Sequence, residues 1–181
     1  KTMSEVSQAY LKLIEISERS RQHAHGLPEQ EQAKSIWSGV GFTLNDRRYV
    51  APMDEVSEIL TVPRYTQVPG VQSWVKGIAN VRGRLMPVMD LMAFLNNPSQ
   101  LQLKRRRLLA LERGELYSGL VVDEVLGMQH IAQDLYTQTV PGEYADTMPY
   151  LKGGFETEKG FFAWFSLYEL ARDPRFLNVA S

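Results

Sequence analysis

The chain contains no cysteine, and this absence narrows the classes of protein to which it can belong. Without thiols there is no disulfide scaffold, no cysteine nucleophile and no thiolate metal site. No apolar run approaches the roughly 18 residues that a membrane-spanning helix needs. The N-terminal segment is polar and charged, unlike a secretory signal. We therefore expect a cytoplasmic protein with no direct membrane insertion.

An excess of one charge is also missing. The 181 residues include 20 Lys+Arg and 21 Asp+Glu, which gives a formal net charge of -1. Such a balance creates no global field that would attract nucleic acid or an anionic membrane. The hydrophobic content of 44% is sufficient for the core of one domain or of two small ones.

Patterns that carry catalysis or bind metal are absent as well. Residues 54–55 and 123–124 are Asp–Glu pairs, but adjacent side chains of a strand point to opposite faces and make a poor acid–base pair. His23 and His25 do not share a face of a helix, and His130 stands alone. We therefore expect no enzyme, and no catalytic residue, metal or cofactor.

The N-terminal segment is predicted to be helical. Its apolar residues recur at helical spacing and form one stripe, and Gly26-Leu27-Pro28 ends the pattern before a polar linker, residues 29–35. The stripe comprises Val6, Ala9, Tyr10, Leu13 and Ile14. It could dock on the rest of the chain or bind a partner, and the sequence leaves both possibilities open.

From Trp37 onward the pattern changes to short strands separated by turn signals. Strands are predicted over residues 37–44, 48–52, 56–62, 106–111, 116–122, 125–131, 150–156 and 161–165, with two more in residues 76–90. Short helices are predicted over residues 91–95 and 167–171, and a loop over residues 140–148. The fold class is therefore mainly β.

The two strand-rich halves resemble each other. Asp54-Glu55-Val56 recurs as Asp123-Glu124-Val125, Lys76-Gly77 recurs as Lys152-Gly153, and each half ends in a strand followed by a short helix. The pattern indicates two related, mostly antiparallel five-stranded units, which at this size usually close to hide their edges. We predict units at about 37–98 and 99–172, after an extension, 1–36, and before a tail, 173–181.

The most informative segment is residues 76–91. An apolar strand enters a polar turn at Asn80 and Arg82-Gly83, and a second apolar strand ends at Asp90. An amide and a guanidinium held on a turn between rigid strands are suited to binding a partner. Alternatively, Arg82 is a solvated turn residue, and Asn80 is present for turn geometry alone.

Two other segments allow a second function, a small nucleic-acid-binding barrel. Lys104-Arg105-Arg106-Arg107 could contact phosphates, although a solvated charge run fits the neutral balance of charge better. The aromatic residues within 161–165 could stack on bases, although a core strand is the simpler interpretation. A third possibility, an enzyme with an unfamiliar site, has no constellation to support it.

Residues from about 40 to 170 resemble the CheW-like domain, the coupling protein of bacterial chemosensory arrays. The resemblance rests on Tyr49, Val56-Ser57-Glu58-Ile59, Pro69, Lys76-Gly77-Ile78, Asn80, Arg82-Gly83, Pro87-Val88, Asp90-Leu91 and Val122-Asp123-Glu124-Val125. It implies two SH3-like five-stranded β-barrels joined at a groove. The long extension, with residues 37–42 and 50–53, resembles the CheW-like adaptors of type IV pilus (twitching motility) systems.

The resemblance also implies partners and sites. It predicts a non-enzymatic adaptor between the helical hairpin tip of a chemoreceptor and the regulatory domain of a CheA-like histidine kinase, recruited to membrane-associated arrays. The positions that match the receptor groove are Val56, Glu58, Gly77, Asn80, Val81 and Arg82. The kinase face would lie opposite the groove, with Tyr65, Val68 and Leu85 as its contacts. A second kinase contact through the other barrel is implied without assigned residues.

Within the groove, we expect Glu58 and Arg82 to form a pair that holds strand and turn in the binding geometry. Gly77, which has no side chain, would let a partner helix approach the backbone. Val56 and Val81 would supply apolar contact.

Overall fold

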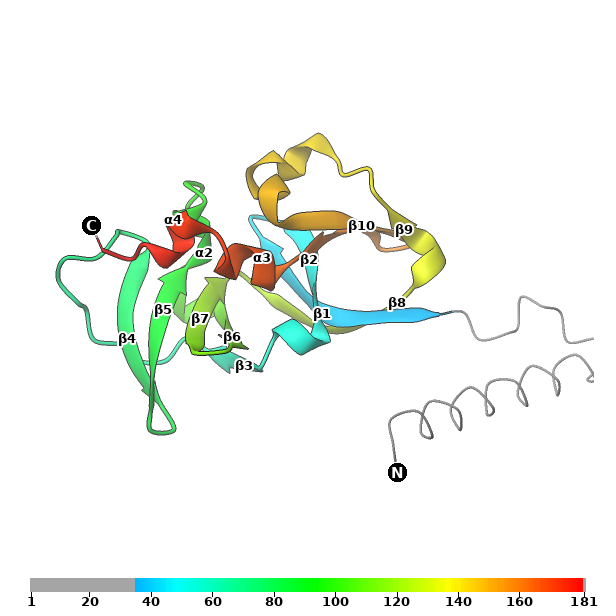
Figure 1. The fold of residues 1–181 in the computed structure, drawn as a ribbon. Coiled ribbons are helices and arrows are strands. Elements are labelled where there is room, and N and C mark those ends of the chain that lie inside the picture. The colour runs from blue at the N-terminus through cyan, green and yellow to red at the C-terminus, as the bar shows by residue number, and fades with distance from the viewer. Residues whose placement is uncertain (1–34, 181) are drawn as a thin grey trace, which may run out of the picture. The chain divides into compact units, whose positions relative to one another are not determined.

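The computed structural model describes residues 35–180, so the predicted N-terminal helix, with His23 and His25, lies outside the described residues. Residues 37–131 and 135–180 belong to a single folded unit, which carries every predicted site residue. Figure 1 shows its strands and short helices.

Strands are the main elements of the described residues. They are β1 (Ile36–Leu44), β2 (Arg47–Pro52), β3 (Glu58–Thr61), β4 (Val75–Val81), β5 (Arg84–Asp90), β6 (Arg107–Arg113), β7 (Leu116–Val122), β8 (Val125–Ala132), β9 (Tyr136–Thr137), β10 (Leu151–Thr157) and β11 (Gly160–Phe165). The α-helices are α2 (Leu91–Phe94), α3 (Leu167–Ala171) and α4 (Pro174–Leu177). Short 3-10 helices are Met53–Glu55, Leu103–Arg105, Gln133–Leu135 and Gly142–Tyr150. The predicted mainly β class is confirmed.

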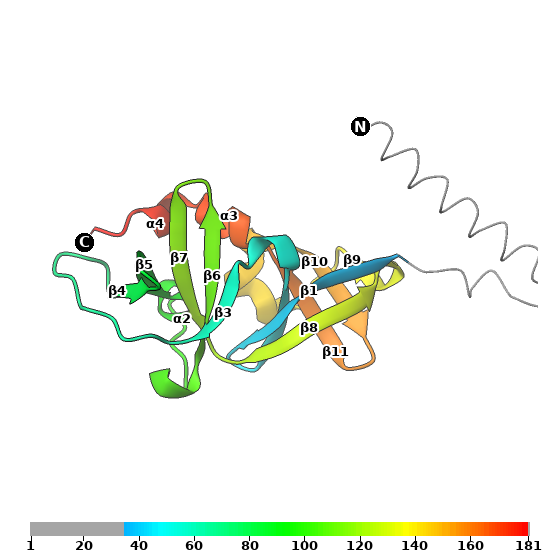
Figure 2. The ribbon, with the colours of Figure 1, turned by 90° about the horizontal axis from the view of Figure 1, so that it is seen from below.

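The strands form two sheets, and each sheet draws on both halves of the sequence. The six-stranded sheet has the order β8-β1-β2-β11-β10-β9, and the five-stranded sheet has the order β3-β6-β7-β5-β4. In Figure 2 the hairpin β6–β7 lies beside β3, away from the strands that follow it in the chain. The sheets therefore do not follow the predicted division into residues 37–98 and 99–172, nor the expected five strands in each.

The exchange of hairpins preserves the duplication. β2 runs parallel to β11, pairing Tyr49 with Ala163, just as β7 runs parallel to β5, pairing Gly119 with Val88. The hairpin β1–β2 of the first half therefore joins the sheet formed by β8 to β11. In the same way, the hairpin β6–β7 of the second half joins the sheet formed by β3 to β5. The sequence indicates the duplication but not the exchange of hairpins, because the sequence of an apolar strand does not specify which strand pairs with it.

The exchange explains why several strands are apolar on both faces. In β6, Leu109 and Leu111 belong to the large core cluster shared by both sheets, whereas Leu108 and Ala110 belong to a cluster formed within the five-stranded sheet. A third cluster, which includes Val50, lies within the six-stranded sheet. Strands buried on both faces read as continuous apolar runs.

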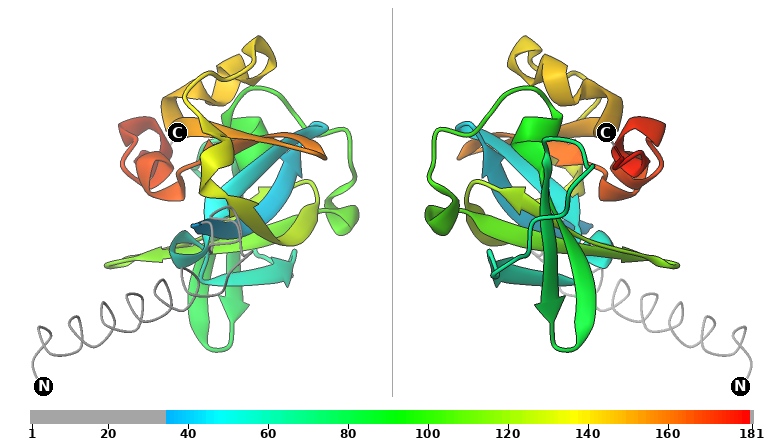
Figure 3. Two further views of the ribbon diagram at one scale, coloured as in Figure 1. Left: turned by 90° about the vertical axis from the view of Figure 1, so that its right-hand side faces the viewer. Right: turned by 90° about the vertical axis from the view of Figure 1, so that its left-hand side faces the viewer.

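Helix positions agree with the duplication. α2 is capped by Asp90, whose Oδ1 accepts from the N–H of Ala93 at 3.3 Å, and α3 is capped by Ser166, whose Oγ accepts from the N–H of Glu169 at 3.2 Å. Figure 3 shows α3 and α4 next to each other, with Gly142–Tyr150 close to α3. Most of the predicted loop 140–148 is this 3-10 helix, and α4 and the two-residue β9 were not predicted.

Candidate functional site

The β4–β5 turn has the geometry of a tight hairpin. Arg82 and Gly83 both have positive φ, 52° and 84°, as a two-residue primed turn requires. The side-chain oxygen of Asn80 accepts a hydrogen bond from the N–H of Gly83 at 2.8 Å. This contact favours the interpretation that Asn80 fixes the turn.

Arg82 and Glu58 form an ion pair between the two outer strands of the five-stranded sheet. Glu58 opens β3, and Arg82 lies in the turn after β4; β3 and β4 are the first and last strands in the sheet order. The hydrogen bond from Arg82 lowers the pKa of the Glu58 carboxyl, and the same bond raises the pKa of the guanidinium. The side chain of Arg82 is 67% exposed and that of Glu58 is 28% exposed, so both can be reached by a partner.

Gly77 is in close contact with the chain itself. A Cβ atom there would lie 2.8 Å from the carbonyl carbon of Thr66 and 2.9 Å from Cδ2 of Tyr65. Thr66 pairs with Ile78 through two backbone hydrogen bonds of 2.8 and 2.9 Å. The space beside Gly77 is therefore filled by the segment that leads from β3 to β4, which differs from the expectation that a partner helix would fill it.

The apolar members of the predicted groove do not form one face. Val56 packs against the cluster shared by both sheets, whereas Val81 packs against the cluster inside the five-stranded sheet. On the predicted kinase face, Tyr65 packs against the same inner cluster, Val68 is half-buried, and Leu85 is 67% exposed. Leu85 is thus the most accessible apolar anchor among these residues.

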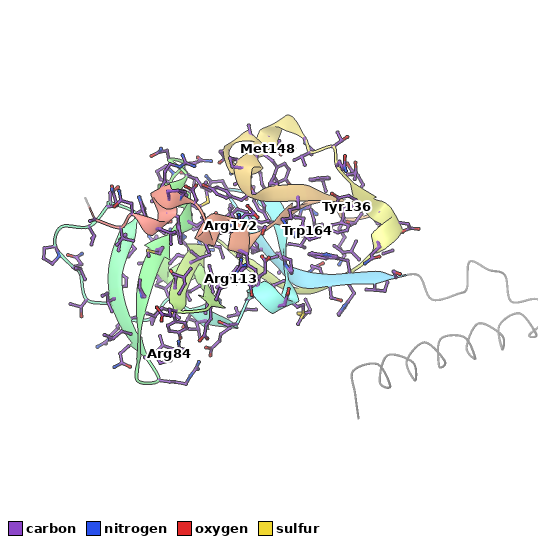
Figure 4. The ribbon with its side chains drawn as sticks, viewed as in Figure 1. Arg84, Arg113, Tyr136, Met148, Trp164 and Arg172 are labelled. Atoms are coloured by element: carbon purple, nitrogen blue, oxygen red, sulfur yellow. The ribbon has the colours of Figure 1, made fainter. Side chains whose placement is uncertain are left out.

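The two predicted faces meet on one hairpin. Asn80 of β4 lies directly opposite Leu85 of β5, and residues paired in this way point to the same side of a sheet. A residue assigned to the receptor groove therefore stands beside one assigned to the kinase face. Next to them, Arg84 lies over the ring of Tyr117, 3.8 Å from its centroid, near the tip of the hairpin (Figure 4).

A cavity of about 450 Å³ lies elsewhere in the unit. It is lined by Thr43, Asp46, Arg48, Leu126, Gln129, Lys159 and Phe162. Among these residues only Phe162 belongs to a candidate binding segment of the sequence, the aromatic run 161–165, and the candidate surface lies outside this cavity.

Sequence reasoning missed a buried ionic cluster centred on Arg106. Two guanidinium nitrogens donate to the two carboxylate oxygens of Asp90 at 2.8 and 3.0 Å, and Nε lies 3.3 Å from Oδ1 of Asp123. The side chains of Arg106, Asp90 and Asp123 are 4%, 9% and 4% exposed. The basic run 104–107 therefore does not present four cations to a nucleic acid. The interpretation of the run as a solvated face is wrong for Arg106.

The adjacent carboxylates divide between core and surface, although neither pair lies in a strand: residues 54–55 belong to a 3-10 helix and residues 123–124 lie between β7 and β8. Glu55 and Asp123 are buried, whereas Asp54 and Glu124 are exposed. Glu55 accepts a hydrogen bond from the N–H of Leu167 at 2.7 Å, so it ties the 3-10 helix after β2 to the start of α3. Burial raises the pKa of Glu55, although its backbone hydrogen bonds counter the effect.

Within residues 35–180 no helix is long and apolar enough to cross a membrane. The same part of the chain has no group of three or more His, Cys, Asp or Glu residues suited to hold a metal ion. His130 instead lies 2.9 Å from the hydroxyl of Ser38 through Nδ1.

Comparison with known proteins agrees with this architecture. The sequence profile of the CheW-like domain matches residues 38–174. The chain is 46% identical to protein PilI of Pseudomonas aeruginosa over 98% of its own length and 99% of that protein. It is 26% identical to the chemotaxis protein CheW of Helicobacter pylori over 67% of its length and 73% of the relative. The chain belongs to the CheW-like family of adaptor and scaffold proteins.

The fold is also that of a solved relative. The crystal structure of the scaffolding protein TtCheW from Thermoanaerobacter tengcongensis matches with a TM-score of 0.63 and 24% identity, over 72% of this chain and 89% of that one. At this identity the likeness concerns the fold alone.

Proposed function

We propose that this protein is a non-enzymatic adaptor that joins a chemoreceptor to a CheA-like histidine kinase. Such a function needs binding surfaces on a rigid body and no chemistry. Membership of the CheW-like family supports the general role. The partners are the helical hairpin at the cytoplasmic tip of the receptor and the regulatory domain of the kinase.

The ion pair between Glu58 and Arg82 is the observation that carries the receptor side of the proposal. It fixes the exposed β4–β5 turn to β3 and leaves a guanidinium accessible at the surface. A planar guanidinium can keep one partner inside the protein and still offer donors to a carboxylate or carbonyl of a bound helix. The kinase side rests on Leu85, which is large, apolar and exposed on a rigid strand.

The similarity to PilI supports a narrower role, the control of type IV pilus twitching motility. The receptor and kinase would then belong to the pilus chemosensory system, and the adaptor would be recruited through them to membrane-associated arrays.

The receptor side is tested by exchanging the charges of the pair. Arg82→Glu places two carboxylates together, and we expect it to abolish binding to the receptor hairpin while the protein stays folded. The double variant Glu58→Arg with Arg82→Glu restores opposite charges in the reverse order. Isothermal titration against the receptor hairpin measures both, with circular dichroism as the check on folding.

The double variant separates two roles of the pair. If the pair only holds the turn, the double variant recovers binding; if the guanidinium also contacts the receptor, binding stays weak. Arg105→Glu, at an exposed position outside the predicted receptor and kinase surfaces, is the matched control for a change of net charge. Normal receptor binding by Arg82→Glu would contradict the receptor side of the proposal.

A further inference from the structure

The C-terminal residues 174–180 make ordered contacts that lie almost entirely beyond the part of the chain matched by the family profile, residues 38–174. We call these residues the C-terminal clasp. They comprise α4 and the segment after it, and Figure 1 shows them beside the chain that leads into β4. The sequence predicts only a tail over residues 173–181.

The clasp is anchored by Phe176, whose side chain is 1% exposed. Its ring is stacked on that of Trp74, with centroids 5.7 Å apart, and meets the ring of Phe94 edge to face at 5.4 Å. Trp74 ends the β3–β4 loop, residues 62–74, and its carbonyl accepts from the N–H of Asp90 at 2.7 Å. Phe176 therefore packs on the point where this loop joins the core.

Backbone pairing extends the contact along the same loop. The N–H of Gln72 donates to the carbonyl of Val179 at 2.9 Å, and Nε2 of Gln72 donates to the carbonyl of Ala180 at 2.9 Å. Val71 and Ala180 form an antiparallel bridge. The clasp thus acts as a short extra strand beside the loop.

The β3–β4 loop carries two residues of the predicted kinase face, Tyr65 and Val68. It is held at Thr66 by pairing with Ile78 and at Val71 by pairing with Ala180. Val68 lies between these two attachments, and Gly70 follows it in a left-handed conformation, with φ of +74°. Loss of the second attachment would free the loop from Gln67 to Gln72.

From these contacts we propose that the C-terminal clasp is a positioning element, which holds the β3–β4 loop in the conformation that binds the kinase. The inference rests on the proposed function for the identity of the partner. Phe176 is not assigned a contact with the kinase; it acts through Trp74 and the loop. A preformed loop binds more tightly than a mobile one because less conformational entropy is lost on binding.

The test compares Phe176→Ala with Leu177→Ala in the full chain. Leu177 lies on the same helix and is 51% exposed, so it is a matched control that leaves the packing intact. Hydrogen exchange at the amide of Gln72 measures the loop without any partner, and titration measures binding of the kinase regulatory domain and of the receptor hairpin.

We expect Phe176→Ala to speed exchange at Gln72 and to weaken kinase binding by about tenfold, with receptor binding changed by less than about twofold. The conservative variant Phe176→Leu should keep exchange at Gln72 slow and retain most of the affinity for the kinase domain. Deletion of residues 179–181 keeps Phe176 but removes the pairing with Val71 and Gln72 and the packing of Val179 on the core. It therefore tests the same inference should Phe176→Ala fail to fold.

Two results would overturn the positioning role of the clasp while leaving the proposed function intact. One is unchanged exchange at Gln72 in both Phe176→Ala and the deletion variant. The other is unchanged kinase binding despite fast exchange. An unmodified protein that binds no kinase domain would instead overturn the proposed function and, with it, the role of the clasp in partner binding.

Discussion

Arg106 and Asp90 form a buried ion pair in which two guanidinium nitrogens meet both carboxylate oxygens, at 2.8 and 3.0 Å. Asp90 ends β5 and caps α2, and Arg106 immediately precedes β6. Nε of Arg106 also donates to the carbonyl of Val122 at 3.2 Å, at the end of β7. The pair therefore ties together the ends of three strands that come from both halves of the duplicated sequence.

Removal of Arg106 leaves the buried carboxylates of Asp90 and Asp123 without their cation. We expect Arg106→Ala to lower the free energy of unfolding by about 3–5 kcal/mol, since a buried charge without its partner is strongly unfavourable. Urea denaturation followed by tryptophan fluorescence measures the change. Arg105→Ala, at the exposed neighbour of Arg106, should alter stability by less than about 0.5 kcal/mol. Equal effects of the two substitutions would contradict the assignment.

Gly77 gives a second stability prediction. In Gly77→Ala the new methyl group would meet the backbone of Thr66, with a contact of 2.8 Å to its carbonyl carbon, and backbone cannot rotate away as a side chain can. We expect a loss of about 1–3 kcal/mol in unfolding free energy. Gly142→Ala, where a Cβ atom meets nothing within 4 Å, is the control and should be nearly neutral. A neutral Gly77→Ala would show that Thr66 does not lie against this glycine in solution.

Glu55 gives a prediction of pH dependence. Because burial raises the pKa of Glu55 in the folded protein, the folded state holds its proton more tightly than the unfolded state does. Its contribution to stability is therefore greatest below the unfolded pKa and declines as the pH rises through the folded pKa. In Glu55→Gln this decline is absent, and the amide oxygen can still accept from the N–H of Leu167.

The stability of Glu55→Gln relative to the unmodified protein should thus increase from acid to neutral pH. Urea denaturation at a series of pH values measures the difference, and Glu124→Gln, at an exposed carboxylate, serves as the control. A difference that shrinks with rising pH would contradict the raised pKa.

The positions of most strands could be predicted from the sequence because alternation and turn residues act locally. The predicted ranges for β7 and α3 coincide with those observed, residues 116–122 and 167–171. β9 has two residues, too few to show a period, and α4 has four. Which of the two sheets a hairpin joins depends on contacts between distant parts of the chain. The sequence of a single strand therefore does not indicate the exchange.

The candidate site was predictable only in part. Glu58 and Arg82 are 24 residues apart in sequence, and their pairing came from family resemblance rather than from local pattern. The burial of Arg106 was hidden because its neighbours are three further cations. A signal was present nonetheless, since Asp90 ends one apolar strand and Asp123 directly follows another. A carboxylate in such a position needs a partner if it is buried.

In the proposed function, one molecule holds receptor and kinase together. Asn80 of the receptor groove and Leu85 of the kinase face are, however, cross-strand neighbours on the same side of one hairpin. The most direct measurement is a titration of the kinase regulatory domain into the protein, free and then saturated with the receptor hairpin. We expect binding in both cases and a ternary complex with one copy of each component. Failure to bind the kinase domain once the receptor hairpin is bound would contradict the proposed function, because the two partners would then compete for one surface.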